Sequence, residues 1–207
     1  MMLHGEQGLV VHRPLPASGK LRGVTRVVEV IDKGEGRGAL LYLERQVADA
    51  DSGELYATVK GTVFARADGG FGGPAGPLRE VHAIPAGEPD AVLDMPTLPQ
   101  SALLYRLNGD MNPIHADPQA ARSAKFPQPI LHGMCTYGVA AHAILKQFGN
   151  YDPAALRELD VRFSAPMFPG ETVSFSMWKR GSVVSFRARV NSRDATVLDN
   201  GRAVLVG

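Results

Sequence analysis

The residues most suited to chemistry lie near the middle of the chain, where Asp110, Asn112 and His115 fall within six positions. Gly109 and Pro113 restrict the backbone around them, so this segment can hold an acid and an imidazole in one geometry. A carboxylate and an imidazole that both face a water can orient it and share its proton, which is general acid–base chemistry. Taken singly, however, Asp110 would be an ordinary turn cap and His115 an ordinary surface residue. The residue types alone leave both interpretations open.

A long helix is predicted after this loop. Apolar residues recur at steps of three and four between His132 and Phe148, which is the period of one helix face. A shorter helix is expected at 100–107, and another begins near Asp117, an N-cap candidate followed by Pro118. The predicted apolar face of the long helix consists of Met134, Tyr137, Ala141, Ile144 and Phe148. The small residues that would let it approach a sheet closely are Gly133, Gly138, Ala140 and Ala143.

The rest of the chain has the pattern of β-strands separated by turns. The Gly-rich stretch 34–38 is typical of a hairpin turn and lacks the spacing of a phosphate-binding loop. A Gly/Pro cluster at 68–77 and further prolines up to 89 indicate a linker, which divides the chain into units 1–77 and 90–207 joined by residues 78–89. Strands are predicted at 9–13, 24–31, 38–47, 55–65, 159–164, 171–179, 182–191 and 202–206.

The order of strands repeats within the chain. Residues 11–16 and 163–168 each run from a strand into a proline stop. Identities between the two copies are few, but the shared order favours a duplicated unit over coincidence. The long helix precedes the strands of the second copy only, so the first copy is expected to lack it. The other aligned segments are 38–47 with 181–190, and the turn 51–53 with 198–201.

Composition excludes several classes of protein. The 22 Lys and Arg residues against 21 Asp and Glu residues leave a net charge of +1, which argues against a nucleic-acid or membrane-surface binder. The single cysteine, Cys135, excludes an intrachain disulfide and a multi-thiolate metal site, and packing is its favoured role. No apolar run approaches the ~18–20 residues of a membrane span, and the N-terminus does not resemble a signal peptide. A soluble, cytoplasmic protein is expected.

The whole loop, with the sequence YRLNGDMNPIH, resembles the signature of the MaoC-like, or (R)-specific enoyl-CoA hydratase 2, family of the hotdog-fold superfamily. That signature contains an aromatic, an aliphatic and a small residue before Gly-Asp-x-Asn-Pro-aliphatic-His, and a small residue after a spacer, where Ala121 lies. Asn108 departs from it, since Ser, Thr, Gly or Cys is usual there. The resemblance makes the catalytic interpretation of Asp110 and His115 the favoured one. It continues through residues 129–134, 4–7 and 12–16.

This resemblance implies an α+β double-hotdog fold, in which antiparallel sheets wrap around a long central helix. The strings at 4–7 and 12–16 are similar to the non-catalytic N-terminal unit of double-hotdog members. With no central helix in residues 1–77, that first unit is expected to be incomplete, and catalysis is assigned to residues 90–207. An upstream segment, or a partner chain in a homodimer, would then cover the apolar face that the missing helix leaves open.

The resemblance also implies roles for individual residues. Asp110 and His115 would flank a catalytic water, and the backbone N–H of Gly133, at the start of the central helix, would face the thioester oxygen. A helix N-terminus has free N–H groups and a partial positive charge, which suit that oxygen as it becomes enolate-like. The supporting residues would be Asn112, Gly109, Pro113 and His132, the last either assisting the site or simply packed.

The implied reaction is the reversible hydration of trans-2-enoyl-CoA to (3R)-3-hydroxyacyl-CoA in fatty-acyl metabolism. No metal or redox cofactor is expected, since coenzyme A enters as part of the substrate, and an acyl-carrier-protein thioester is the other candidate handle. Basic residues between 157 and 193 could attract the phosphates of coenzyme A, although a solvated sheet face is the commoner explanation. The alternatives are a hotdog thioesterase, which needs a water aimed at the carbonyl carbon, and a non-catalytic acyl-binding subunit of a larger dehydratase.

Overall fold

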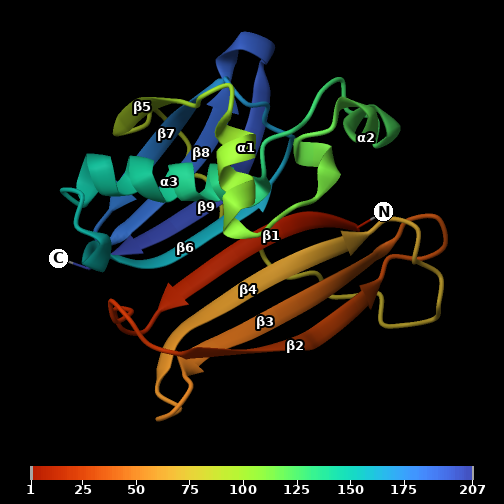
Figure 1. Cartoon of the computed structure of the whole chain (residues 1–207), viewed down its shortest axis with the longest axis horizontal. Coiled ribbons are helices and arrows are strands. Elements are labelled where there is room, and N and C mark those ends of the chain that lie inside the picture. Colours follow the sequence, from red (N-terminus) through yellow and green to blue (C-terminus); the bar gives the residue numbers. More distant parts are fainter. Residues whose placement is uncertain (1, 207) are drawn as a thin grey trace.

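The computed structural model describes residues 2–206, which form one nine-stranded sheet with the order β2-β3-β4-β1-β6-β9-β8-β7-β5 (Figure 1). Every neighbouring pair of strands in it is antiparallel. The strands are β1 (Met2–Val11), β2 (Leu21–Asp32), β3 (Ala39–Asp49), β4 (Leu55–Ala65), β5 (Ala91–Pro96), β6 (Leu156–Phe163), β7 (Thr172–Arg180), β8 (Val183–Val190) and β9 (Ala195–Leu205). The helices are α1 (Ser101–Tyr105), α2 (Pro118–Ser123) and α3 (Gly133–Phe148), with 3-10 turns η1 (Arg106–Asn108), η2 (Pro113–His115), η3 (Pro153–Ala155) and η4 (Asn191–Arg193).

The predicted duplication is visible in the strand order. From the central β1–β6 pair outward, one half of the sheet has the order β1-β4-β3-β2 and the other has the order β6-β9-β8-β7. In each half the first strand along the chain is therefore central, and the fourth, third and second strands follow toward the edge. β1 ends at Val11 and β6 at Phe163, as the aligned proline stops predict. The two copies therefore share a single continuous sheet, with β5 added at the outer edge of the second copy.

The prediction of a turn at 198–201 is wrong. Residues 198–201 lie inside β9, and the connection from β8 to β9 is η4. Asn200 has a φ of 54°, and the register between β6 and β9 shifts between Asp160 and Arg162, which face this stretch. The Asp-Asn-Gly sequence therefore forms a β-bulge, because a turn and a bulge draw on the same residue types and strand pairing decides between them.

Strand ends also differ from the sequence-based prediction. β1 begins at Met2 rather than at residue 9, since it pairs with β4 along most of its length and with β6 through Glu6–Val10. β9 begins at Ala195 rather than at 202, and β5 was not among the predicted strands. Pairing on both sides stabilises a strand such as β1, although its first residues are too polar to show the apolar pattern of a β-strand.

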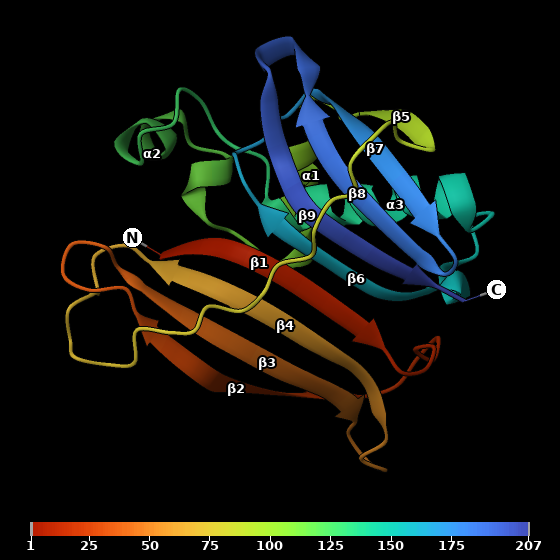
Figure 2. The same cartoon turned by 180° about the vertical axis from the view of Figure 1, so that it is seen from behind.

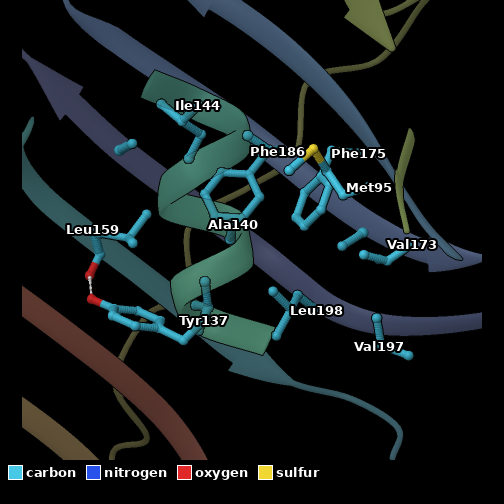
Figure 3. Close-up of a cluster of buried hydrophobic side chains, with 14 of the residues drawn as sticks. Met95, Tyr137, Ala140, Ile144, Leu159, Val173, Phe175, Phe186, Val197 and Leu198 are labelled. Atoms are coloured by element: carbon cyan, nitrogen blue, oxygen red, sulfur yellow. Dashed lines mark hydrogen bonds between the residues drawn. The ribbon is translucent and has the colours of Figure 1, made fainter. Parts of the chain in front are cut away.

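Helix α3 lies across one face of the second half of the sheet and forms the core with it (Figures 1 and 3). Ala140, Ala143 and Ile144 have no exposed surface, and Tyr137 donates a 2.7 Å hydrogen bond to the carbonyl of Leu159. Burial raises the pKa of the Tyr137 hydroxyl. On the sheet side the largest buried side chains include Phe175, Phe186, Leu159, Met177 and Leu198.

The buried face of α3 differs in part from the predicted one. Tyr137 and Ile144 are buried as expected, whereas Met134, Ala141 and Phe148 are only half-buried. Ala140 and Ala143 are fully buried beside Tyr137 and Ile144, in keeping with the close approach to the sheet predicted for these small side chains. Gly138 is exposed, so it does not serve the close approach predicted for it.

The first half of the described chain contains strands but no helix before α1. Residues 66–90 form neither helix nor strand, and they cross the outer face of the sheet, opposite α3 (Figure 2). His82 is hydrogen-bonded to Ser185 through its ring, and its carbonyl accepts a bond from Asn200. These contacts fix the connection between the two halves. No helix in residues 2–206 combines the length and apolar character needed to cross a membrane.

Asp32 fixes the start of this connection. Its buried carboxylate accepts hydrogen bonds from the backbone N–H groups of Gly34, Gly70, Gly72 and Gly73, at 2.7 to 3.3 Å. The bonds from Gly70 and Gly34 contribute most to holding the pKa of Asp32 below its ordinary value. The end of β2 is thereby tied to the glycine-rich segment that follows β4.

We expect Asp32→Asn to lower the thermal midpoint of unfolding at neutral pH. A carboxyl whose pKa is lower in the folded state stabilises the fold above its unfolded pKa of about 3.9, and that stabilisation is lost as the pH falls through the folded pKa. The difference in Tm between the wild type and Asp32→Asn should therefore shrink on acidification, as measured by circular dichroism melts. Asp51→Asn, at an exposed turn residue, is the control. A pH-independent difference would contradict this role of the charge.

Candidate active site

The loop between α1 and η2 is built by short-range hydrogen bonds. Gly109 has a φ of 103°, in the left-handed region that favours glycine, and it ends η1. The carboxylate of Asp110 accepts a 3.2 Å bond from the N–H of Asn112, and the side-chain oxygen of Asn112 accepts a 3.3 Å bond from the N–H of Ile114. Pro113 then starts η2, which carries His115. These residues give the loop one shape.

This shape brings Asp110 and His115 together with His132. Each of the three side chains has an atom that can bind a proton or a metal ion, and these three atoms all lie within 4.8 Å of one another. His115 is buried and its Nδ1 lies 2.8 Å from the carbonyl oxygen of Ile130, so Nδ1 carries the proton and donates it in a hydrogen bond. In the neutral tautomer that this bond selects, Nε2 is the nitrogen without a proton, as a base requires.

The two imidazoles of this cluster are stacked. The ring centroids of His115 and His132 are 3.6 Å apart and the planes are 23° from parallel. A metal ion lies in the plane of each imidazole that binds it, and the in-plane lone pairs of two stacked rings do not converge on one point. The cluster therefore fits proton transfer better than metal binding.

Gly133 is the first residue of α3, and His132 is the N-cap residue but makes no capping hydrogen bond with its side chain. The first N–H groups of a helix lack an acceptor one turn back; that of Cys135 donates to the carbonyl of His132 at 3.0 Å, whereas that of Gly133 is available to a ligand. A Cβ placed on Gly133 would lie 3.2 Å from the ring of Phe163. Glycine thus keeps the approach to this helix end open beside Phe163, at the end of β6.

Four residues around the cluster were not predicted from the sequence. Tyr105 packs against His132 with ring centroids 4.7 Å apart, and it is the aromatic position of the loop signature. His4 packs on Phe163 with centroids 4.8 Å apart, so the first half of the sheet reaches the site. The resemblance covers His4 and Ile130 but gives them no place at the site, since strand pairing and the loop after α2 bring them there together with Phe163.

Burial shifts the pKa of two further groups at the site. It is the main cause that raises the pKa of Tyr105, and the negative charges of the Cys135 thiolate, which forms only at high pH, and of Asp110 add to it. Burial also raises the pKa of Cys135. A thiol with a raised pKa stays protonated and is a poor nucleophile, which favours the packing role predicted for Cys135.

A cavity of about 240 Å³ opens beside His115. Apolar side chains dominate its lining, with Gln128 as the polar amide among them. A larger cavity of about 340 Å³ lies under residues 79–82 and is lined by charged side chains such as Lys60, Asp160 and Arg202. The smaller cavity is the one that adjoins the candidate base. Its other lining residues are Pro99, Ala102, Leu103, Ala116, Pro129 and Pro169.

Four of the seven basic residues between 157 and 193 form ion pairs with acids. Arg187 is bonded to Asp199 at 2.8 Å, and Arg193 is bonded to Glu171 and to the carbonyl of Pro166. Paired guanidinium groups on a partly exposed sheet favour the interpretation of a solvated face over that of a phosphate site.

Comparison with known proteins agrees with this geometry. The model of the MaoC like domain matches residues 80–200, which contain the loop, α3 and the second half of the sheet except the end of β9. The chain belongs to the MaoC-like family. Residues 1–67 of this MaoC-like chain match a second model, the MFE-2 hydratase 2 N-terminal domain.

Relatives of this MaoC-like chain extend over nearly its full length. It is 45% identical to 3-hydroxyacyl-thioester dehydratase Y of Mycobacterium tuberculosis, with 97% of this chain and 71% of the relative covered. The crystal structure of a MaoC-like dehydratase from Phytophthora capsici is 40% identical, has a TM-score of 0.92, and is matched over 100% of this chain and 72% of its own. A third structure, Rv0216 of Mycobacterium tuberculosis, is described as a double hotdog fold. It is 18% identical with a TM-score of 0.62, and the match covers 99% of this chain and 75% of that one. At this identity the likeness shows the fold alone. The double-hotdog architecture predicted from the loop is therefore confirmed.

Proposed function

We propose that this MaoC-like chain is an enzyme that interconverts trans-2-enoyl thioesters and (3R)-3-hydroxyacyl thioesters by adding or removing water. The observation that carries the proposal is the pairing of Asp110 with a His115 whose Nε2 is left free by the bond from Nδ1 to Ile130. The name of the mycobacterial relative describes the dehydration direction, and the N-terminal match is to a hydratase domain. Coenzyme A is proposed as the carrier of the acyl group, with acyl carrier protein as the other candidate.

The mechanism follows from the chemistry of a thioester. Its carbonyl makes the α-proton acidic and the β-carbon electrophilic, so water adds without the help of a metal or a redox cofactor. In the hydration direction Asp110 and His115 together take a proton from the water as its oxygen bonds to the β-carbon, and they return a proton to the α-carbon. The enolate-like oxygen formed in between would face the N–H of Gly133 at the positive end of α3. Dehydration reverses these steps.

The direct test is an absorbance assay of crotonyl-CoA and longer enoyl-CoA substrates, with the stereochemistry of the product determined. We expect the enoyl absorbance to disappear as the (3R)-alcohol forms. Release of the free thiol of coenzyme A from a substrate whose double bond remains would instead identify a thioesterase. Binding of the thioester without either reaction would identify a non-catalytic acyl-binding subunit.

The proposal extends to the organisation of the chain. Residues 1–77 would be a non-catalytic hotdog unit without its own central helix, 78–89 a linker, and 90–207 the catalytic unit. The two separate family matches, at 1–67 and 80–200, support this division. A cytoplasmic location is proposed, since a chain with a single cysteine gains no intrachain disulfide from an oxidising compartment, and cell fractionation would test it.

We further expect the protein to be a homodimer. Val24, Val27 and Val28 of β2 are 37%, 56% and 48% exposed, on a half of the sheet that no helix of its own covers. Exposure of ~400 Å² of apolar surface forfeits on the order of 10 kcal/mol, so a second copy that covers exposed apolar side chains of this half of the sheet would stabilise it. Light scattering and crosslinking at low micromolar concentration should give the mass of a dimer. A stable monomer under these conditions would contradict the expectation.

A further inference from the structure

We propose that His132 is a positioning residue: a neutral imidazole, protonated at Nε2, that holds the Asp110 loop and the His115 ring against the N-terminus of α3. Its tautomer and neutrality can be tested without substrate. Its kinetic consequence rests on the proposed hydratase function.

The hydrogen bonds of His132 determine its tautomer. The residue is 1% exposed, and its Nε2 lies 3.2 Å from the backbone carbonyl oxygen of Asp110. A carbonyl oxygen only accepts, so Nε2 must carry a proton. The other ring nitrogen, Nδ1, is shielded from solvent and has no hydrogen-bond partner among the described residues. A proton on Nδ1 would be a buried donor without an acceptor, which is costly, whereas the neutral ring leaves only a lone pair there.

The surroundings of His132 also oppose a positive charge. Burial is the largest cause that lowers its pKa, and His115 on η2 and Arg106 on η1 act in the same direction. The carbonyl and the carboxylate of Asp110 act in the opposite direction but do not reverse the shift. The remaining titratable neighbours, Tyr105 on α1 and Cys135 on α3, both have raised pKa values and stay uncharged near neutral pH. A proton carrier would need a ring that gains and loses charge readily, whereas the lowered pKa and the unpartnered Nδ1 of His132 both favour the neutral ring.

Three contacts of His132 join the parts of the site. Its Nε2–H binds the backbone of Asp110, its ring face covers that of His115 at 3.6 Å, and its backbone is the N-cap that precedes Gly133. A neutral π face against His115 also suits an imidazole that becomes transiently positive, since a cation is attracted to such a face. His132 therefore fixes the acid, the base and the helix end relative to one another without contacting the reacting atoms.

Two substitutions separate the two side-chain contacts. His132→Gln keeps an N–H donor near the position of Nε2 but removes the ring face, whereas His132→Phe keeps the face and removes the donor. A misplacement of about 1 Å in a catalytic group lowers the rate by about 10²-fold, so kcat should fall by up to that factor in each variant. KM and the pKa values of the pH–rate profile should stay near those of the wild type, because no substrate contact and no proton carrier is lost. His142→Gln, at an exposed position of the same helix, is the matched control and should leave kcat unchanged.

The second measurement is ¹⁵N NMR of the histidine rings in the wild-type protein without substrate. We expect His132 to show protonated Nε2 and unprotonated Nδ1 at every pH between about 5 and 8, where an unperturbed histidine titrates. Titration of His132 within that interval, or loss of one limb of the pH–rate profile in folded His132→Gln, would overturn the proposal in favour of proton transfer by His132. Full activity of both folded variants would reduce His132 to a packing residue. If no hydratase activity is found at all, the NMR result still decides the tautomer, so the two failures are distinguishable.

Discussion

Asp110→Asn and His115→Gln are each expected to lower kcat for enoyl-CoA hydration by roughly 10²–10⁴-fold, the contribution of a positioned acid–base group. Both substitutions nearly preserve side-chain size, and Asp110 is exposed. In His115→Gln, the new side-chain amide could still donate to a carbonyl such as that of Ile130, as the imidazole does. The fold should therefore survive, and circular dichroism melts should show little change. Steady-state kinetics with one enoyl-CoA substrate measure the effect.

The double variant Asp110→Asn/His115→Gln should be scarcely slower than either single variant. Two groups that act on one water lose their joint effect when either is removed, so their losses do not multiply. Asp117→Asn provides a control, since Asp117 caps α2 with a 2.7 Å bond from Gln119 and lies outside the cluster. Losses that multiply, or a single variant with full activity, would reject the assignment of the pair.

Features of the chain that depend on neighbouring residues were predictable from the sequence. α3 spans Gly133–Phe148 where the apolar period predicts a helix over 132–148, and α2 begins at Pro118 with Asp117 as its N-cap. Helix periodicity and capping are set within a few positions of the chain. The family prediction rested chiefly on the loop at 105–115, with weaker support from other segments, and is confirmed by the domain match at 80–200. The roles of Asp110, His115 and Gly133 stay predictions.

Features that depend on pairing were not predictable. The bulge at Asp199–Gly201 and the early start of β1 arise from register with distant strands, which no local pattern specifies. The same limit applies to the site. The sequence placed His132 beside Gly133, but only the folding of the Asp110 loop back onto α3 stacks His132 on His115 and leaves Nδ1 without a partner among the residues described.

Substitution of Gly133 should separate the role of the helix end in turnover from its role in stability. A side chain at this position blocks the approach of a thioester oxygen to the first N–H groups of α3, although it leaves those groups in place. Loss of one such contact raises the barrier by about 3 kcal/mol, or roughly 10²-fold in kcat. Gly133→Val is expected to show this loss together with a smaller decrease in Tm.

Contact with Phe163 explains part of the expected decrease in Tm, and a second substitution can remove that part. A Cβ at Gly133 would lie 3.2 Å from Phe163, so Gly133→Val also crowds that ring. Phe163→Leu makes room for the new side chain. Gly133→Val should therefore lower Tm less in the Phe163→Leu background than in the wild type, while kcat stays low in both. Gly138→Ala is the matched control: it lies on the same helix, a Cβ there meets nothing within 4 Å, and loss of a helical glycine stabilises by about 1 kcal/mol without affecting turnover. Normal turnover by Gly133→Val would mean that the oxygen of the thioester is stabilised elsewhere, because the new side chain would fill the approach to the N–H of residue 133.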